Sequence, residues 1–470
     1  MSMQKKRIAV TISFSFSIRY LVRTGMLEKM KAFCEPVICI FWNQEDLINE
    51  LRVKGFEVHL LPETQRSSAY SDIRIKIDYW FKFFQLKSPT KNVEPRYIEK
   101  FKSKKKVIIQ RLREYYNFFL LLIPGVAANL HKREKQLLLS DTNYNDMLKL
   151  VDELKIDGVF AVTPFHVQED TFLRAAESKG KLMIASILSF DNVVKRGWLP
   201  VNYQCYMVWN KYNANEIRRI YKKAVQLNND NVNVVGAPQF DFYSSAKYIL
   251  PKKDWLELVG LPDTNKKIIL YAGGPVSLFP QEPQFLQHID EAITNGTIPG
   301  DPIILFRCHP IDRIERWKKA MGESKNIFFD SSWTGGGKLT HANITEQDIN
   351  KLCSTLFHTD VHINVASTMT VDGSAYMKPQ IGPGYDEVYP NSKYPLVSYY
   401  YQEFYLPIMN TNGLAVAHSR KELIDYVSEA LQHPEHFIKK SKDIVEAIIT
   451  FTDGKSTDRV IEVLKREIEK

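Results

Sequence analysis

The sequence predicts an α/β protein of two domains, each with a mainly parallel β-sheet covered by helices. The chain has 470 residues, and a single hydrophobic core stops growing at about 250–300 residues, so longer chains usually divide. Its composition, 44% hydrophobic and 25% charged, is typical of globular proteins. Short apolar runs alternate with polar stretches of helix length, which is the pattern of strands joined by crossover helices.

Seven short apolar runs indicate the strands of the first domain, which we expect to span residues 1–240. After the first run, residues 17–32 have the composition of a helix. Residues 71–140 interrupt the alternation, and we interpret them as a basic helical insertion. The seven runs are Arg7–Phe14, Val37–Phe41, Val58–Leu61, Gly158–Thr163, Leu182–Ala185, Tyr206–Val208 and Val232–Val235.

A second series of strands and helices predicts a second α/β domain over residues 241–440. The final segment, residues 441–470, indicates two helices separated by a loop at Thr452–Ser456. Helices are expected at Pro283–Ile293, Thr345–Phe357 and Lys421–Leu431. The strands are expected at Lys267–Tyr271, Pro302–Cys308, Asn326–Phe329, Val361–Asn364 and Pro379–Gly382.

The positive charge of the chain is concentrated in the insertion. The net charge is +9, whereas Arg74 to Lys135 holds 16 Lys/Arg against 5 Asp/Glu, a net of +11 that leaves −2 for the rest. The longest apolar run in this segment is about a dozen residues, short of the ~20 that cross a bilayer. We therefore expect the insertion to rest on anionic lipid or on a lipid-linked acceptor without crossing the membrane.

The cysteines and the N-terminus indicate a cytoplasmic protein, peripheral on the inner face of the membrane through this insertion. The five cysteines are scattered, and they lack the C-x-x-C spacing of zinc or redox sites. The N-terminus passes from a basic start into an apolar strand, without the cleavage pattern of a signal peptide.

The segment after the strand Val361–Asn364 is a candidate phosphate site. Ligands of open α/β sheets bind beyond the carboxyl ends of the strands. Ser367 or Thr368 can cap the helix expected at Thr368–Tyr376, where free amide groups and the helix dipole favour an anion. A plain helix cap without a ligand fits the same residues and stays an open alternative.

The strand Pro302–Cys308 runs into Arg307-Cys308-His309-Pro310. A histidine at the end of a strand can donate to a phosphate oxygen, and Arg307 can add a charge-assisted bond. A partly solvated loop histidine is the alternative interpretation.

The first strand leads into a segment with Ser17 and Arg19, at the position where Rossmann-like folds hold phosphates. No glycine lies between this strand and the following helix. A close approach of a dinucleotide is therefore disfavoured, which argues against a nicotinamide enzyme.

The polar loop after the strand Leu182–Ala185 is a candidate acceptor site. It contains Asp191, Asn192, Lys195 and Arg196. Asp191 could accept the proton of an acceptor hydroxyl. The alternative is that Asp191 only caps the loop.

Taken in order along the chain, these segments resemble a bacterial branch of the GT-B glycosyltransferase superfamily. The nearest groups are the CDP-glycerol glycerophosphotransferase-like enzymes and the capsule or lipopolysaccharide transferases. The resemblance covers most of residues 186–460. It rests on the loop from Phe190 to Gly197, on Val208-Trp209-Asn210, on the linker Val235–Asp241, on Ile268–Tyr271, on Arg307–Pro310 and on Asn364–Asp372.

This resemblance implies two Rossmann-like domains facing across a cleft, with residues 441–470 packed back on the first domain. It implies that His309, Ser367 and Thr368 hold the phosphates of the donor and that Asp372 lies near the ribose. No bound metal is implied, since a helix N-terminus and basic side chains neutralise the leaving diphosphate. His358 and His362 have a spacing used by zinc sites, but His362 falls in a predicted strand, so the pair would not share a helical face.

The function that follows from the resemblance is metal-independent transfer of a sugar from a nucleotide-activated donor to a cell-envelope or capsular glycan, with no other cofactor. A CDP-polyol phosphate transferase and a nucleotide-sugar 2-epimerase are alternatives. A basic nucleic-acid-binding protein is the non-enzyme alternative. It is disfavoured because the excess charge lies in one insertion without a recognition module, so no nucleic-acid partner is expected.

Overall fold

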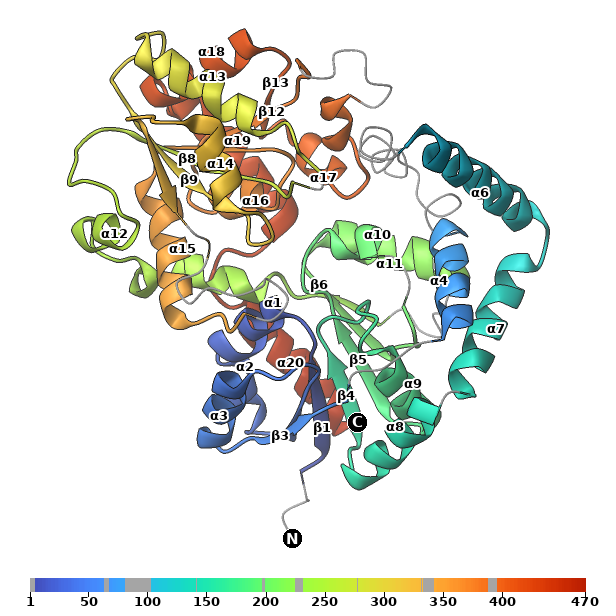
Figure 1. The fold of residues 1–470 in the computed structure, drawn as a ribbon. Coiled ribbons are helices and arrows are strands. Elements are labelled where there is room, and N and C mark those ends of the chain that lie inside the picture. The colour runs from blue at the N-terminus through green and yellow to red at the C-terminus, as the bar shows by residue number, and fades with distance from the viewer. Residues whose placement is uncertain are drawn as a thin grey trace. The chain divides into compact units, whose positions relative to one another are not determined.

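The computed structural model describes residues 5–62, 67–80, 103–140, 142–196, 199–224, 231–276, 278–330, 332, 342–387 and 395–470. The chain divides into two compact units (Figure 1). Unit 1 contains the described residues of 1–87, 101–239 and 455–470, and unit 2 contains those of 240–454. Each unit has its own parallel sheet, which confirms the predicted class of two α/β domains.

Unit 1 is built on a seven-stranded parallel sheet in the order β3-β2-β1-β4-β5-β6-β7. The central strands are apolar on both faces because helices cover both sides, and β1 buries five of its six residues. The order reverses between β1 and β4, the place where such sheets open toward ligands. The strands are β1 (Arg7–Ile12), β2 (Glu35–Ile40), β3 (Glu57–Leu60), β4 (Gly158–Ala161), β5 (Leu182–Ser186), β6 (Cys205–Val208) and β7 (Val232–Val234).

The helix expected over residues 17–32 is broken into three short pieces. Gly25 has φ of +70°, a left-handed conformation that separates the second piece from the third. The pieces are α1 (Ser15–Ile18), the π-helix η1 (Arg19–Arg23) and α2 (Met26–Met30). The further helices of unit 1 are α3 (Glu45–Val53), α4 (Ser68–Trp80), α6 (Lys104–Leu122), α7 (Val126–Leu139), α8 (Thr142–Glu153), α9 (Asp170–Ser178), α10 (Asn192–Arg196), α11 (Lys211–Ala224) and α20 (Ser456–Glu469).

The basic insertion forms helices α4, α6 and α7 where it is described, and its residues 81–102 lie outside the described ranges. The buried side chain of Glu134 on α7 connects the insertion to the rest of unit 1. The carboxylate accepts hydrogen bonds from Arg174 of α9 at 2.8 Å and from Tyr70 of α4 at 3.2 Å. This network ties α7 to α4 and to a helix that covers the sheet.

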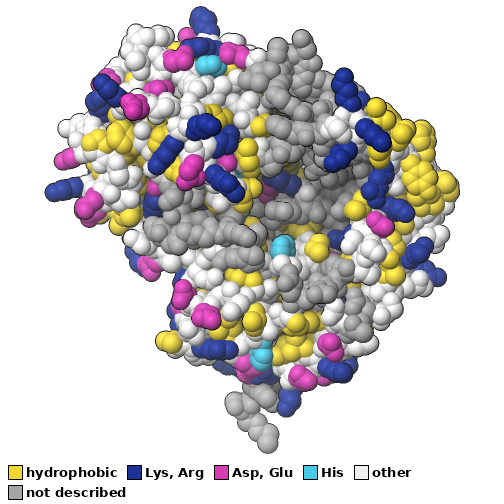
Figure 2. Space-filling model, viewed as in Figure 1, with side chains coloured by type: hydrophobic (Ala, Val, Ile, Leu, Met, Phe, Trp, Pro, Cys, Tyr) yellow, Lys and Arg dark blue, Asp and Glu magenta, His cyan; other side chains and the backbone are white. Residues whose placement is uncertain are grey.

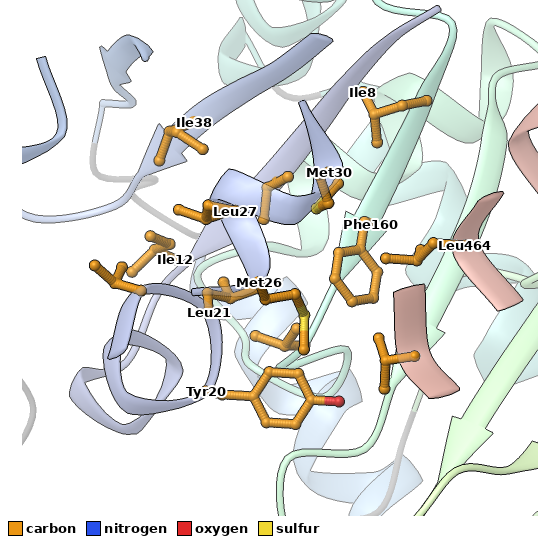
Figure 3. Packing of buried hydrophobic residues seen from close by; sticks show 14 of the residues in the cluster. Ile8, Ile12, Tyr20, Leu21, Met26, Leu27, Met30, Ile38, Phe160 and Leu464 are labelled. Atoms are coloured by element: carbon orange, nitrogen blue, oxygen red, sulfur yellow. The ribbon is translucent and has the colours of Figure 1, made fainter. Parts of the chain in front are cut away.

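The C-terminal helix α20 completes the core of unit 1. Val460 and Leu464 are wholly buried, and Figure 3 shows Leu464 beside Phe160 of the central strand β4. Lys29 and Asp458 form an exposed ion pair at 2.5 Å between α2 and α20. The last helix therefore packs in unit 1, although it follows all of unit 2 in sequence.

The boundary expected at residue 440 differs from the observed one at 454. Residues up to 454 stay with unit 2, including α19 (Glu435–Ile444) and the π-helix η7 (Val445–Ile449). The reason is packing: Ile444 lies so close to Gly413 that an added Cβ there would meet it at 2.4 Å. Ser441 also donates to the carbonyl oxygen of Lys378 at 2.6 Å.

Unit 2 is built on a six-stranded parallel sheet in the order β10-β9-β8-β11-β12-β13. The edge strand β13 was not predicted, because three residues carry too little pattern to stand out. Trp255 lies in the core and donates through Nε1 to Thr355 at 3.0 Å. The strands are β8 (Ile268–Ala272), β9 (Ile303–Arg307), β10 (Ile327–Asp330), β11 (Val361–Asn364), β12 (Gln380–Pro383) and β13 (Ala415–Ala417).

The helices of unit 2 cover this sheet and agree in position with most of those expected. Besides α19 and η7, they are the 3₁₀-helices η4 (Pro238–Ser244, which begins two residues before the unit), η5 (Ala246–Tyr248) and η6 (Leu396–Tyr399), and the α-helices α12 (Lys252–Leu258), α13 (Pro283–Thr294), α14 (Ile314–Met321), α15 (Glu346–His358), α16 (Met369–Ser374), α17 (Leu406–Met409) and α18 (Arg420–Gln432). Within the described ranges, none of the helices in either unit has the length and apolarity needed to cross a membrane.

The packing of α20 predicts a specific loss of stability. Leu464→Ala should destabilise unit 1 by about 2–5 kcal/mol, because it removes buried methyl groups from a core that closes only partly around the cavity. Urea unfolding followed by circular dichroism measures this. Glu462→Ala, an exposed change on the same helix, is the control and should have little effect. An equal effect of both substitutions would contradict the observed packing.

Candidate functional site

The loops that follow β8, β9 and β11 of unit 2 all leave the sheet at the carboxyl ends of these strands. The parallel register places Arg307 of β9 beside Ala272 of β8, and Ala272 beside Asn364 of β11. His309 therefore lies just after β9, on one side of β8. Ser367 and Thr368 lie just after β11, on the other side of β8. The sequence prediction that these residues share an edge agrees with the topology, and the β8–α13 loop lies between them.

His309 is half-buried in the turn after β9, and one hydrogen bond orients its ring. The backbone N–H of Ile311 donates to Nδ1 of His309 at 3.2 Å. In the neutral ring the proton is therefore on Nε2, which can donate to an anion. Asp312 stabilises the turn by accepting from Trp317 Nε1 at 2.8 Å and from Arg316.

Arg307 points into the protein instead of toward a ligand, which differs from its expected role in binding a phosphate. It is 7% exposed, and its Nη2 donates to the carbonyl oxygen of Ser332 at 3.0 Å. Asp330 lies 3.7 Å from Nη1 and also pairs with Lys351 at 2.5 Å. Burial lowers the pKa of Arg307. Two buried cations thus share one carboxylate at the end of β9 and β10.

The Ser367 turn is stabilised by side chains rather than by a long helix. Asn364 Oδ1 accepts from the backbone N–H of Ser367 at 3.1 Å and from the hydroxyl of Thr370 at 2.9 Å. Ser367 Oγ accepts from the N–H of Met369 at 3.3 Å. Ala366 has φ of +42°, a strained value for a residue with a Cβ.

The helix that follows this turn is shorter than expected. It begins at Met369 and has six residues, and the side chain of Thr368 makes no capping bond. A helix this short has a weaker dipole than the one predicted over Thr368–Tyr376. The expected anion site therefore depends on the turn itself and on the hydroxyls of Ser367 and Thr368.

Asp372 lies one turn further along α16 and is buried. Tyr243 of η4 donates to Asp372 Oδ1 at 2.5 Å, across 129 residues of sequence. Sequence reasoning did not identify Tyr243, because no local spacing links the two. Gly373, the next residue, packs against His362 and Gln380, where an added Cβ would lie 2.2 Å from His362 Nδ1.

Glu282 was also missed, and it positions the loop between β8 and α13. Its carboxylate is wholly buried and accepts from the N–H of Gly274 at 2.8 Å and from the hydroxyl of Tyr271 at 3.4 Å. Burial raises the pKa of Glu282 from 4.5 to about 8. An added Cβ on Gly274 would meet Phe279 at 2.5 Å, so packing requires this glycine. The signal in the sequence was Gly273-Gly274-Pro275 directly after an apolar strand.

In unit 1, the contacts of Asp191 are those of a loop cap. Asp191 is buried, and it accepts from Asn192 Nδ2 at 3.0 Å and pairs with Lys195 at 3.2 Å. Lys195 is half-exposed. The side chain of Arg196 lies outside the described part of the chain.

The first turn of unit 1 does not present its serines to solvent. Ser17 is wholly buried, and its hydroxyl has no hydrogen-bond partner among the described residues. The guanidinium of Arg19 lies 5.6 Å from the ring centre of Phe16. This geometry does not favour the predicted role of Ser17 in phosphate binding, because α1 begins at Ser15 and turns Ser17 inward.

A buried carboxylate lies behind this turn. Glu169 accepts hydrogen bonds from Thr11 at 2.8 Å, from Ser13 and from Thr163. Burial raises its pKa from 4.5 to about 7. These bonds join the end of β1 to the end of β4, and they leave Ser13 engaged within the protein.

The histidines with zinc-like spacing have other partners. His362 lies 2.8 Å from the hydroxyl of Thr359, and burial lowers its pKa to about 3. His358 Nε2 lies 2.7 Å from the carbonyl oxygen of Leu250. Across the described residues, no three His, Cys, Asp or Glu side chains gather in a metal-binding arrangement.

Residues 202–466 match the family model of CDP-Glycerol:Poly(glycerophosphate) glycerophosphotransferase. No curated protein matches the sequence significantly. The chain is similar in structure to the S. aureus MnaA–UDP complex, with a TM-score of 0.56, 10% identity, and coverage of 99% of this chain and 97% of that one.

Two further solved structures resemble the chain over almost all of their length. The UDP-GlcNAc 2-epimerase from Neisseria meningitidis bound to UDP-GlcNAc has a TM-score of 0.53 and 10% identity, covering 98% of this chain and 100% of that one. A glycosyltransferase from Rickettsia africae ESF-5 has a TM-score of 0.51 and 11% identity, covering 99% of each chain. At these identities the likeness concerns the fold.

The buried Glu282 predicts a pH dependence of stability. Its pKa is raised from 4.5 to about 8, so the folded chain holds a proton that the unfolded chain loses. Stability should therefore fall as the pH rises from 4.5 to 8, by up to about 1.4 kcal/mol per pH unit. Glu282→Gln should remove this part of the slope. Urea unfolding at pH 6 and pH 8 measures it.

The control is Glu257→Gln, at an exposed position of unit 2, which should keep the slope of the unaltered protein. Glu169 adds a slope of its own, so the comparison between variants carries the result. Equal slopes for Glu282→Gln and the unaltered protein would contradict the inferred protonation.

Proposed function

We propose that this chain, which belongs to the CDP-glycerol:poly(glycerophosphate) glycerophosphotransferase family, transfers a group from a CDP-linked donor to a hydroxyl of a cell-envelope or capsular polymer. Membership of the family makes the chain a nucleotide-linked transferase, since the matching residues are 202–466 of 470. We propose in addition that the transferred group is a polyol phosphate and that the acceptor is a glycan. We propose further that no bound metal is needed.

A donor site in unit 2 is supported by the segments of His309 and Ser367, which lie at the same end of the sheet. His309 and Ser367 leave strands that both pair with β8, and the family match includes both segments. His309 can donate through Nε2 to a phosphate oxygen, while Ser367 and Thr368 offer hydroxyls on the other side of the β8–α13 loop. One donor bound across that loop would contact both segments.

The proposed reaction is displacement at the phosphorus that carries the polyol. The acceptor oxygen forms a bond to that phosphorus. The bond from the same phosphorus to the oxygen shared with cytidine monophosphate breaks, and the monophosphate leaves with the electron pair. Hydrogen bonds from His309 would stabilise the charge that develops on the phosphate oxygens.

The hydroxyl proton must pass to a base, and Asp191 stays the candidate. Its pairing with Lys195 at 3.2 Å supplies a counter-charge to the ionised carboxylate, the form that a base requires. The same contacts fit a loop cap. Asp191→Asn keeps the shape of a cap and removes the base.

Sugar transfer and 2-epimerisation are the competing functions, and the UDP-linked neighbours are the observation that favours them. Assays with different donors, with and without an acceptor, distinguish polyol phosphate transfer, sugar transfer and 2-epimerisation. Release of cytidine monophosphate from CDP-glycerol that depends on an acceptor supports the proposal. Release of UDP from UDP-GlcNAc that depends on an acceptor supports sugar transfer, and conversion of UDP-GlcNAc without an acceptor supports an epimerase.

A nucleotide bound by unit 2 should stabilise the folded protein. At about 100 times its Kd a ligand adds ~2.7 kcal/mol, which corresponds to about 5–10 °C in Tm for a domain of this size. CDP-glycerol and CDP should shift the Tm more than UDP, and EDTA should leave both the shift and the turnover unchanged. A larger shift with UDP, or loss of turnover in EDTA, would contradict the proposed donor or the proposed metal independence.

Removal of the His309 imidazole should slow transfer without unfolding the protein. His309→Ala should lower turnover at least about a hundredfold, because one donor to developing charge contributes ~2.7–4 kcal/mol. His309→Gln keeps an N–H donor and should retain more activity. His433→Ala, at an exposed histidine of the same unit, is the control. Near-full activity of His309→Ala would place the donor site elsewhere.

A further inference from the structure

Two buried tyrosines of unit 2 lie in the connection between β12 and β13, beside the candidate donor site. Tyr400 and Tyr405 are both wholly buried. Tyr400 donates to the carbonyl oxygen of Pro383, the last residue of β12, at 2.9 Å. The hydroxyl of Tyr405 lies 2.8 Å from the hydroxyl of Thr370, on the helix that follows β11. A buried phenol hydroxyl needs a polar partner, and both tyrosines find theirs at the carboxyl end of the sheet.

The hydroxyl of Tyr405 begins a chain of hydrogen bonds that ends on the backbone of Ser367. Thr370 donates its single hydroxyl proton to Asn364 Oδ1 at 2.9 Å, so Tyr405 is the donor in the bond to Thr370. Asn364 Oδ1 also accepts from the backbone N–H of Ser367 at 3.1 Å. The carbonyl oxygen of Ser367, 3.3 Å from Tyr405 Oη, is a second acceptor for the phenol proton. Burial raises the pKa of Tyr405 above its usual value, so the phenol keeps this proton and stays a donor.

The packing around these tyrosines leaves them little freedom. An added Cβ on Gly382 would lie 2.5 Å from Tyr400 Oη, so only a glycine at this position admits the tyrosine. Tyr399 packs on Phe279 of the β8–α13 loop, with the ring centres 4.9 Å apart. The connection between β12 and β13 therefore contacts the β8–α13 loop as well as the turn that follows β11.

The turn that Tyr405 contacts is strained. Ala366 has φ of +42°, in the left-handed region that a residue with a Cβ rarely adopts. Such a conformation persists only where the surrounding structure holds it. The hydrogen-bond chain holds the backbone on both sides of Ala366, because it includes Asn364 and Ser367. Without the chain, the turn is free to relax.

We propose that Tyr405 is a positioning residue of the donor site, whose hydroxyl acts through Thr370 and Asn364 to hold the Ser367 turn in the conformation that receives the donor phosphate. The inference rests on the proposed function, since it assigns this turn to the donor. Because Tyr405 is wholly buried, it acts through its neighbours and does not touch the donor. A turn that is held before the donor arrives does not have to be ordered during binding.

The variant Tyr405→Phe tests the proposal, because it removes the hydroxyl and keeps the ring. If the turn relaxes, only a fraction of the protein is ready to bind, and the apparent affinity falls by that fraction. Titration calorimetry of the full-length protein with CDP should give a Kd at least about fivefold higher. The KM for CDP-glycerol should rise by a similar factor while kcat stays within about twofold, because substrate and transition state lose the same binding. This pattern differs from that of His309→Ala, which lowers turnover.

The matched control is Ser441→Ala, which removes another buried hydroxyl of unit 2. Ser441 donates to the carbonyl oxygen of Lys378, which precedes β12 and so lies at the amino end of the sheet. Both variants should lower the Tm by about 2–4 °C, since each loses one buried hydrogen bond. Ser441→Ala should nevertheless bind CDP as the unaltered protein does. An equal Kd for the two variants would overturn the proposal.

A second variant tests whether the hydroxyls act as one chain. Thr370→Val keeps the shape of the side chain and removes the middle hydroxyl. It should raise the Kd for CDP as Tyr405→Phe does, and the double variant should bind no more weakly than the weaker single variant. If the two effects multiply, the hydroxyls act independently and the proposed chain is overturned.

Exposed cations offer another place where a nucleoside diphosphate can bind. Helix α14 has the exposed residues Lys318 and Lys319, in a part of unit 2 where Figure 2 shows several lysine and arginine side chains together. Lys319→Gln should leave the Kd for CDP unchanged. If it weakens binding as much as Tyr405→Phe, the diphosphate binds at the surface and the proposal is overturned.

The same variants distinguish failure of this inference from failure of the proposed function. If the unaltered protein uses CDP-glycerol and Tyr405→Phe has an unchanged Kd and KM, only the inference is overturned. If the protein uses a UDP-linked donor instead and Tyr405→Phe weakens the binding of UDP, the proposed donor is wrong and the role of Tyr405 is supported. If neither CDP nor UDP binds, both are overturned.

Discussion

The pairing of β8 with β9 on one side and with β11 on the other is the constraint on which the candidate donor site depends. All three strands run parallel, so each sends its following loop to the same edge. The spacing between neighbouring strands is about 4.8 Å, which leaves roughly 10 Å between the ends of β9 and β11. That width suits a ligand with several polar groups in a row better than one isolated phosphate, and it gives the β8–α13 loop a central place.

Buried carboxylates stabilise the loops at the carboxyl ends of both sheets, although the two units use them differently. In unit 1, Glu169 receives three side-chain hydroxyls, and in unit 2, Glu282 receives a backbone N–H. Each is wholly buried, and burial raises the pKa of each. A buried carboxylate costs stability unless its hydrogen bonds are satisfied, so these loops have little freedom to move without breaking them.

The sequence was sufficient to predict most strands and helices, but it could not predict most of the contacts between side chains. The strand Val361–Asn364 was placed with the bounds that the structure has, because a short apolar run between polar segments is typical of a buried strand. The bond between Tyr243 and Asp372 could not be predicted, since only the folded chain brings the two together. Arg307 was expected to bind a ligand because it precedes His309, yet the direction of a side chain at a strand end depends on the neighbouring strand.

The insertion illustrates the same limit. Its charge was evident from the composition, whereas the apolar residues of α6 have a spacing that would fit a buried face equally well. The exposure of these apolar residues, such as Leu112 and Phe119, became known only from the folded structure.

The place of α20 has a consequence for how the protein is made. The core of unit 1 lacks Val460 and Leu464 until all of unit 2 has been synthesised, because these residues follow unit 2 in sequence. Unit 2, by contrast, is continuous in sequence over its described part and can fold while the ribosome is still translating. The nascent chain therefore carries an incomplete core of unit 1 while unit 2 is being translated. A stop codon just before Val460 would leave that core open, although the strands of both sheets had been produced.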